Sequence, residues 1–193
     1  MLPRRSACLL SIALLVPLAA PLHADEVSDA LQAASDAYAA GDLGKTASEL
    51  ALANQALGKQ QSALLAALLP EAPEGWTRTL TEDFAQGFAI AGGGSGAEAR
   101  YENADQSASF TLSYIADNPM VASMGAMLGN MQMMTMMGTV VKVGDQPILQ
   151  TDGNLSTLAG GRVLFQAQGA AVDVMLPVVQ SIDFAKVGAF DSR

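Results

Sequence analysis

The chain has 193 residues, of which 50% are hydrophobic and 15% are charged, and 19 acidic residues against ten basic ones give it a net charge of −9. It contains one cysteine and one histidine. A chain this acidic repels phosphate backbones and anionic membrane surfaces, so we expect no nucleic-acid partner.

Residues 1–24 have the pattern of a secretory signal peptide. Arg4 and Arg5 form a short basic region, and the uncharged stretch that follows is too short and too interrupted by proline for a membrane span. Ala24 then supplies the small residue at which signal peptidase cuts. Cys8 has almost nothing hydrophobic before it, so lipidation of this cysteine is not expected. We predict cleavage after Ala24 and export to the periplasm or out of the cell.

Cleavage would leave a mature chain of 169 residues, enough for one ordinary domain with a hydrophobic core. Cys8 and His23 would leave with the signal segment, and the remaining eight basic and 19 acidic residues give a net charge of −11. Without thiol or imidazole the mature chain cannot form a disulfide, a Ser-His-Asp or Cys-His nucleophile system, or a Cys/His zinc site. We therefore predict a non-catalytic protein with no cofactor and no transmembrane span.

The segment 25–69 is predicted to form a helical hairpin. It lacks proline from Glu26 onward, it is rich in alanine and leucine, and its apolar positions recur every three or four residues. Gly41 and Asp42 supply a C-terminal glycine followed by an N-capping acid, which places the turn between two helices there. The expected apolar face of the first helix is formed by Val27, Leu31, Ala34 and Tyr38.

The second helix repeats leucine every seven residues, at Leu43, Leu50, Leu57 and Leu64. The adjoining row consists of Ala47, Asn54, Gln61 and Leu68. We expect the leucine row to pack on the first helix. A coiled-coil dimer is the alternative, although two of the four companion positions are polar and the flanks lack ordered charges.

A turn-rich connection from Leu69-Pro70 to Gly75 marks the boundary to a predicted α+β domain over residues 70–193. Turn residues and alternating patterns predict strands at 97–101, 109–115, 140–143, 147–150, 155–158 and 162–168. Helices are expected at 118–138 and 171–181. The predicted fold class is α+β, with the helical hairpin followed by a mainly antiparallel sheet packed by two helices.

Three constellations were weighed as sites, and none is predicted to be one, so we expect no catalytic, cofactor-binding or metal-binding residues. The adjacent acids Glu82 and Asp83 point apart and are typical of solvent-exposed positions. Asp145, Asp152 and Asn154 lack the alternating ligands of a calcium loop and are expected in turns. The glycine-rich stretch 92–96 lacks the Gly-Lys-Ser or Gly-Lys-Thr ending of a phosphate loop and is expected to be a flexible loop.

A methionine-rich segment is the unusual feature of the sequence. Five methionines follow each other by four, three, four and three residues, which predicts one helical face formed by Met120, Met124, Met127, Met131 and Met134, with Met133, Met136 and Met137 beside it. We favour a core stripe, because methionine is a flexible core filler. Thioethers also bind Cu(I). The uncharged length, with Gly125 and Gly129 at a small-residue spacing, leaves a docking surface for a hydrophobic partner or a membrane open.

The string LLPEAPEGW from Leu68 to Trp76 and the Ser-Ile-Asp-Phe at 181–184 add to the export signal and the hairpin. Together they resemble a family of uncharacterised exported bacterial proteins. The order of strands and helices also resembles the PsbP/Mog1-like α/β modules, which are accessory or assembly factors. Both resemblances imply an architecture and no activity.

The sequence thus predicts an exported protein that binds or has a structural role in the cell envelope, with an unknown protein as a partner. Two alternatives stay open. One is a periplasmic Cu(I)-binding protein that uses the methionine-rich helix, and the other is a module that docks on a hydrophobic partner or a membrane.

Overall fold

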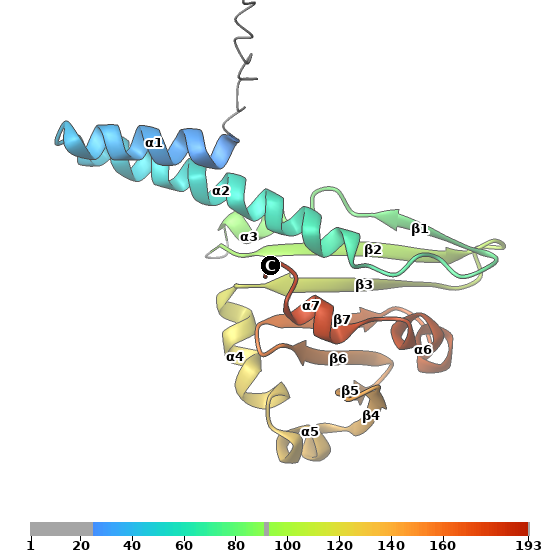
Figure 1. Ribbon diagram of the computed structural model, residues 1–193. Coiled ribbons are helices and arrows are strands. Elements are labelled where there is room, and N and C mark those ends of the chain that lie inside the picture. Colours follow the sequence, from blue (N-terminus) through green and yellow to red (C-terminus); the bar gives the residue numbers. More distant parts are fainter. Residues whose placement is uncertain (1–24, 91–92, 193) are drawn as a thin grey trace, which may run out of the picture.

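The computed structural model describes residues 25–90 and 93–192, so the predicted signal segment 1–24 lies outside the described residues. The fold is α+β, as predicted: an N-terminal helical pair is followed by an antiparallel sheet and further helices (Figure 1). The described helices are α1 (Glu26–Ala39), α2 (Leu43–Ala67), α3 (Gln86–Ile90), α4 (Pro119–Leu128), α5 (Met131–Met137), α6 (Val172–Gln180) and α7 (Phe184–Gly188).

All strands of the described chain join one seven-stranded sheet in the order β1-β2-β3-β7-β6-β5-β4, with every neighbouring pair antiparallel. They are β1 (Trp76–Leu80), β2 (Ser95–Asn103), β3 (Ser109–Ala116), β4 (Thr139–Val143), β5 (Gln146–Thr151), β6 (Asn154–Ala159) and β7 (Val163–Gln168). The six predicted strands are confirmed, and their ends differ from the prediction by at most two residues. Of the glycine-rich stretch 92–96, residue 92 lies outside the described residues, and Ser95 and Gly96 belong to β2 and not to the expected loop.

The alternation along β3 separates the two faces of the sheet. Phe110 and Tyr114 point to the larger core, which α6, α7 and the last turns of α2 complete with Leu65 and Leu69. Ile115 points to the opposite face and joins a smaller core. Residues of α4, α5, β5 and β7 complete that second core, namely Val121, Leu128, Met134, Leu149 and Leu164. The hairpin is therefore fixed on one face of the sheet, and α4 and α5 lie on the other.

The connection after α2 is held by side chains of the first strands. Arg78 Nη1 donates to the carbonyl oxygens of Leu69 and Pro70, at 2.7 Å and 3.1 Å, and Arg78 also pairs with Glu71 at 3.1 Å. The Tyr101 hydroxyl donates to the same Pro70 oxygen at 2.5 Å. Burial raises the pKa of Tyr101 to about 12, so this hydroxyl keeps its proton over the physiological range.

The contact between α1 and α2 differs from the prediction. The buried residues of the two helices are small along their shared length, namely Ala30, Ala34, Ala37, Ala53 and Ala56. Leu31 and Tyr38 are exposed, and so is the whole leucine row Leu43, Leu50, Leu57 and Leu64. The prediction that this row packs on the first helix was wrong, because alanines form the seam and the leucines lie beside it.

Candidate functional site

The methionine-rich segment forms two helices where the sequence predicted one, because α4 ends at Gly129 and Asn130 starts α5. The Asn130 side chain accepts hydrogen bonds from the backbone N–H groups of Gln132 and Met133, at 3.0 Å and 3.4 Å, as an N-cap does. A Cβ on Gly129 would lie 2.7 Å from the Gly125 carbonyl oxygen, so this close turn requires glycine. The glycine spacing therefore belongs to a helix end.

This break also overturns the prediction of five methionines on one buried face. Met134 is 1% exposed and packs in the smaller core, while Met124 and Met127 are half-buried. Met136 is 77% exposed, and four other side chains are between 40% and 47% exposed, namely Met120, Met131, Met133 and Met137. Of the predicted stripe, Met120 and Met131 are thus exposed, and so are Met133, Met136 and Met137 beside it; we call these five side chains the methionine surface.

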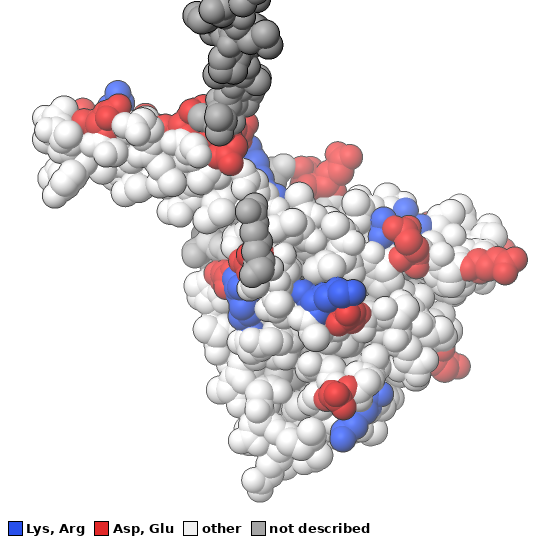
Figure 2. Space-filling model, viewed as in Figure 1, with Lys and Arg blue, Asp and Glu red and all other residues white. Residues whose placement is uncertain are grey.

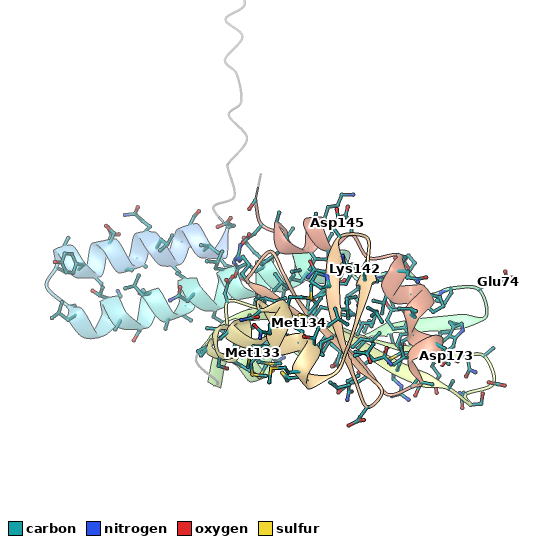
Figure 3. All side chains as sticks on the ribbon, turned by 90° about the horizontal axis from the view of Figure 1, so that it is seen from below. Glu74, Met133, Met134, Lys142, Asp145 and Asp173 are labelled. Atoms are coloured by element: carbon teal, nitrogen blue, oxygen red, sulfur yellow. The ribbon has the colours of Figure 1, made fainter. Side chains whose placement is uncertain are left out.

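Met134 holds this surface in place. In the view from below, Met133 and Met134 lie on α5 and Lys142 lies on the neighbouring strand β4, while the labelled acids Glu74 and Asp173 lie farther from the two methionines (Figure 3). Val121 and Leu128 of α4 pack in the same small core as Met134. Buried anchors on both helices therefore leave the neighbouring methionines pointing outward.

The two helices that carry the methionine surface contain no charged residue. From Asn118 to Val141 the sequence contains no acidic or basic residue. Figure 2 shows the lower part of the molecule, where α4 and α5 lie, as an almost unbroken white area. An apolar, uncharged and flexible surface is suited to contact with another apolar surface, and its thioethers are also soft metal ligands.

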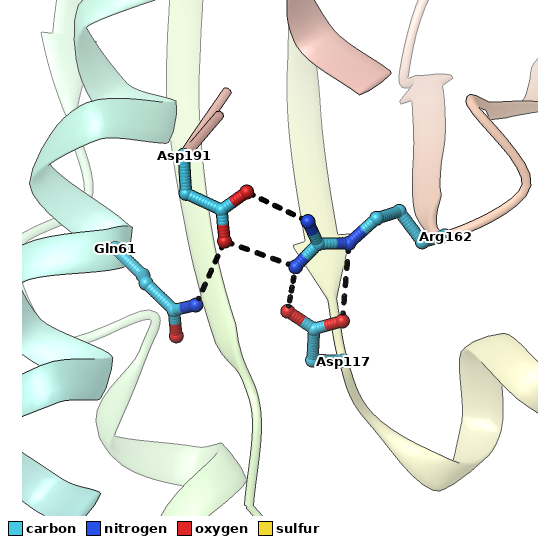
Figure 4. Close-up of polar contacts among 4 residues, drawn as sticks. All are labelled: Gln61, Asp117, Arg162 and Asp191. Carbon is cyan, nitrogen blue, oxygen red and sulfur yellow. Dashed lines mark hydrogen bonds and ion pairs between the residues drawn. The ribbon is translucent and has the colours of Figure 1, made fainter. Parts of the chain in front are cut away.

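A polar cluster around Arg162 lies at the N-terminal end of α4 (Figure 4). Arg162 donates to Asp117 at 2.5 Å and 3.2 Å and to Asp191 at 2.6 Å and 3.1 Å, which is a double bidentate arrangement. Gln61 of α2 donates to Asp191 at 3.1 Å, and the guanidinium lies 5.0 Å from the Phe190 ring centre. Four segments far apart in the sequence meet here.

The charges in this cluster compensate each other. The hydrogen bonds from Arg162 lower the pKa of Asp191, and the two carboxylates raise the pKa of Arg162. Two carboxylates around one guanidinium leave a local charge of about −1, so the cluster offers no free positive charge to an anion. The arrangement is structural: it ties the end of β3, the β6–β7 turn, the C-terminal segment and the hairpin together.

Two shallow hollows lie on the surface of the described residues. One, of about 420 Å³, lies beside the Arg162 cluster and is lined by Asp117, Asn118, Val121 and Gly125 among others. The second, of about 450 Å³, lies on the sheet and includes Arg100, Thr111, Asn154 and Gln168. Arg100 already donates to the Ser109 hydroxyl at 2.7 Å, and Glu98 and Glu102 flank it on the same strand. Neither hollow combines enclosure with an unpaired charged group.

The acidic residues that were considered as site residues in the sequence lie in three separate turns of the fold. Glu82 and Asp83 are exposed in the turn after β1, Asp145 lies in the β4–β5 turn, and Asp152 lies in the β5–β6 turn. Within residues 25–90 and 93–192, no group of three or more His, Cys, Asp or Glu side chains could hold a metal ion. No helix in these ranges combines the length and hydropathy that a membrane span requires.

Comparison with protein-family models, with curated proteins and with solved structures gives no match to the chain. The resemblance to a family of exported proteins therefore stays a prediction. The function of the chain has to be inferred from its exposed surfaces, and two sequence patterns indicate where these surfaces lie. One was the methionine spacing, and the other was the leucine repeat.

Proposed function

We propose that the chain is an exported, non-catalytic protein of the cell envelope that binds an apolar segment of a partner protein through the methionine surface. The observation that carries the proposal is the exposure of five methionines on an uncharged pair of helices, with Met136 exposed at 77%. Methionine side chains are unbranched and polarizable, so they adapt to apolar partners of different shapes. They are common on surfaces that bind amphipathic helices.

A protein segment is a better partner than a lipid surface for this region. Helices that lie in a membrane interface carry Trp, Phe or Leu on one face and Lys or Arg on the other. The segment 118–141 contains neither an aromatic nor a basic residue. The net charge of the chain also opposes approach to anionic lipids.

The non-catalytic assignment is supported by the composition and by the separation of the acids. After loss of residues 1–24 the chain would have no thiol and no imidazole. The acids that were weighed as sites lie in three separate exposed turns, at Glu82-Asp83, Asp145 and Asp152, and Asp117, Asp191 and Glu71 form the ion pairs of Arg162 and Arg78. General acid–base catalysis by carboxylates needs such groups placed together, and acids in separate, solvent-exposed turns do not provide this.

A labelled peptide tests the docking proposal. The probe is a 16-residue fluorescein-labelled peptide of leucine, alanine and glutamine that forms an uncharged amphipathic helix. We expect the parent protein to bind it, and we expect Met136→Glu to weaken binding at least about tenfold, because the carboxylate would lose its water in the interface. Fluorescence anisotropy measures both affinities.

Leu80→Glu is the matched control, because Leu80 is another exposed apolar residue, on β1, and the change introduces the same charge. It should bind the peptide like the parent protein. Equal binding by parent and Met136→Glu proteins, or no binding by either, would contradict the proposal.

Cu(I) binding is the second candidate function. It is favoured by the presence of Met133, Met136 and Met137 within little more than one turn of α5, all exposed. Thioethers bind Cu(I) without having to lose a proton. Replacing these three methionines by leucine separates the candidates, because leucine keeps an apolar surface and removes the sulfur. If the chain binds copper, a Cu(I) titration against a competing chelator should show a stoichiometric site in the parent protein and none in the variant. If the chain docks on an apolar partner, the variant should still bind the peptide.

A further inference from the structure

The helical hairpin carries a second apolar surface, separate from the methionine surface. α1 and α2 extend beyond the edge of the sheet as an isolated pair, with only the last turns of α2 against the body (Figure 1). The seam between them is made of alanines, so the larger apolar side chains of both helices lie outside it. Two isolated helices have no third element to cover those side chains.

The exposed side chains of both helices lie on the same flank of the hairpin. On α1, Leu31 follows the seam residue Ala30 by one position, and on α2, Leu57 follows the seam residue Ala56 by one position. Moving forward by one residue rotates the side-chain direction by about 100° about the helix axis, in the same sense in both helices. Because α1 and α2 run in opposite directions, equal turns away from the seam lead to the same side.

The remaining members follow by helical spacing. Tyr38 stands seven residues after Leu31, and the leucine row of α2 repeats every seven residues, which is close to two full turns. We call the set the leucine flank: Leu31, Tyr38, Leu43, Leu50, Leu57 and Leu64. Its members are between 43% and 68% exposed.

Charged groups of the hairpin lie away from the leucine flank. Asp29 and Asp36 precede the seam residues Ala30 and Ala37, so they turn to the other side of α1. Lys45 and Lys59 lie two residues after Leu43 and Leu57, on the far side of α2. Figure 2 shows the charged side chains of the hairpin along its upper edge, and the face below them is white.

The size of the leucine flank fits a self-association surface. The exposed fractions correspond to roughly 600 Å² of accessible surface on each copy, so complete burial of the leucine flank in two copies would remove about 1,200 Å². Specific interfaces bury about 1,200–2,000 Å² in total. A leucine every seven residues is also the spacing at which one helix seam meets another in a coiled coil or a four-helix bundle.

We infer that the leucine flank binds the leucine flank of a second copy of this chain, so that two hairpins form an antiparallel four-helix bundle. The row is symmetric about its centre, so Leu43 meets Leu64 and Leu50 meets Leu57 when the two α2 helices run in opposite directions. The exposed Asn54 of each copy then lies beside the two-fold axis, where the two amides can pair. The antiparallel arrangement places the two acidic bodies at opposite ends of the bundle.

The first test is the mass of the exported chain in solution. We expect a dimer by sedimentation equilibrium, and we expect Leu57→Glu to weaken it at least about 100-fold, because two unpaired carboxylates would be buried at the interface. Leu52→Glu is the matched control: Leu52 is on the same helix and is more exposed than Leu57, at 53% against 43%, but it lies outside the row. A monomeric parent protein, or equal weakening by both variants, would overturn the inference.

The second test does not depend on a destabilising substitution. In a Cys8→Ser background, single cysteines are introduced by Leu43→Cys and by Leu64→Cys. An antiparallel bundle predicts a disulfide-linked pair when the two variants are mixed and oxidised, and little linkage when either is oxidised alone. Linkage of each variant with itself would show parallel packing and contradict the arrangement. The absence of linkage in all mixtures would show that the leucine flank is not a self-association surface.

Discussion

The Arg162 side chain joins parts of the chain that local sequence patterns cannot connect. Arg162 lies in the β6–β7 turn, Asp117 ends β3, and Asp191 follows α7. Such a cluster becomes visible only when the sheet order β3-β7-β6 is known, because that order brings the three positions to one edge. Gln61 extends it to the hairpin.

The ion pairs of Arg162 predict an acid-dependent contribution to stability. Since the pKa of Asp191 is lowered in the folded protein, its pairing stabilises the fold above the unfolded pKa of about 3.9 and is lost as the pH falls through the folded value. Asp191→Asn should lower the free energy of unfolding by about 1 kcal/mol at pH 7, because the pair is partly exposed. The variant should also lose less stability than the parent protein between pH 5 and pH 2.

Urea unfolding at several pH values measures this difference. Asp145→Asn, in the exposed β4–β5 turn, is the control and should follow the parent curve. If Asp191→Asn kept the full acid dependence of the parent protein, the assignment of that dependence to the Arg162 cluster would be wrong.

The methionines predict unequal effects of substitution at neighbouring positions. Met134 is 1% exposed, so Met134→Ala should cost about 2–5 kcal/mol, whereas Met134→Leu nearly conserves volume and should cost less than about 1.5 kcal/mol. Met136→Ala should change stability by no more than about 0.5 kcal/mol, because that side chain is exposed. Chemical denaturation of the three variants separates these values. Equal losses at Met134 and Met136 would mean that the burial differs from that described.

At the scale of elements, the strands and turns were the most predictable part of the fold. Alternating side chains along β3 and glycine-containing turns such as Gly160-Gly161 are local signals that survive in the folded chain. β1, α3 and α7, of five residues each, were missed, whereas β4, of the same length, was predicted from its valines and from the Gly144-Asp145 turn that follows it. Trp76 and Arg78 become strand residues only through pairing with β2.

Side-chain size misled the prediction for the hairpin. Large apolar residues are expected to face the partner helix, but here alanines form the seam because they let two helices approach closely. The four leucines do form one row along α2, but this row does not pack against α1. A seven-residue repeat shows which side chains share one face of a helix, but it does not show which element packs on that face. For this reason the sequence could not decide between packing within the chain and a coiled-coil dimer.

The break between α4 and α5 was also not predicted from the sequence, because the methionine spacing continues across it. The regular methionine spacing predicts one continuous helix, whereas Gly129-Asn130 is a helix end followed by an N-cap. Asn130→Ala should therefore destabilise the fold by about 1 kcal/mol through loss of the cap. Asn130→Asp should retain most of the stability, because aspartate caps equally well. Thermal unfolding compares the variants, and an Asn130→Ala protein as stable as the parent would contradict the capping role.

At the scale of the whole molecule, the two apolar surfaces are separate, so both could be occupied at the same time. The leucine flank belongs to the hairpin, and the methionine surface lies on α4 and α5, across the sheet from α2. A two-fold dimer of hairpins would carry two copies of the methionine surface. A partner with two apolar segments would then bind with increased avidity, because the second contact is intramolecular.

Export with removal of the predicted signal peptide would define the first residue of the mature chain. If residues 1–24 are removed, Asp25 becomes the first residue, and in the structure Asp25 is the N-cap of α1, with its side chain accepting a hydrogen bond from the Ser28 N–H at 2.9 Å. Cleavage at that point would leave the helix complete. N-terminal sequencing of the exported protein should therefore begin at Asp25, and the melting temperature should not change with reductant, because the mature chain would contain no thiol. Recovery of the intact N-terminal segment, or of a lipid on Cys8, would contradict both the export assignment and the exclusion of thiol chemistry.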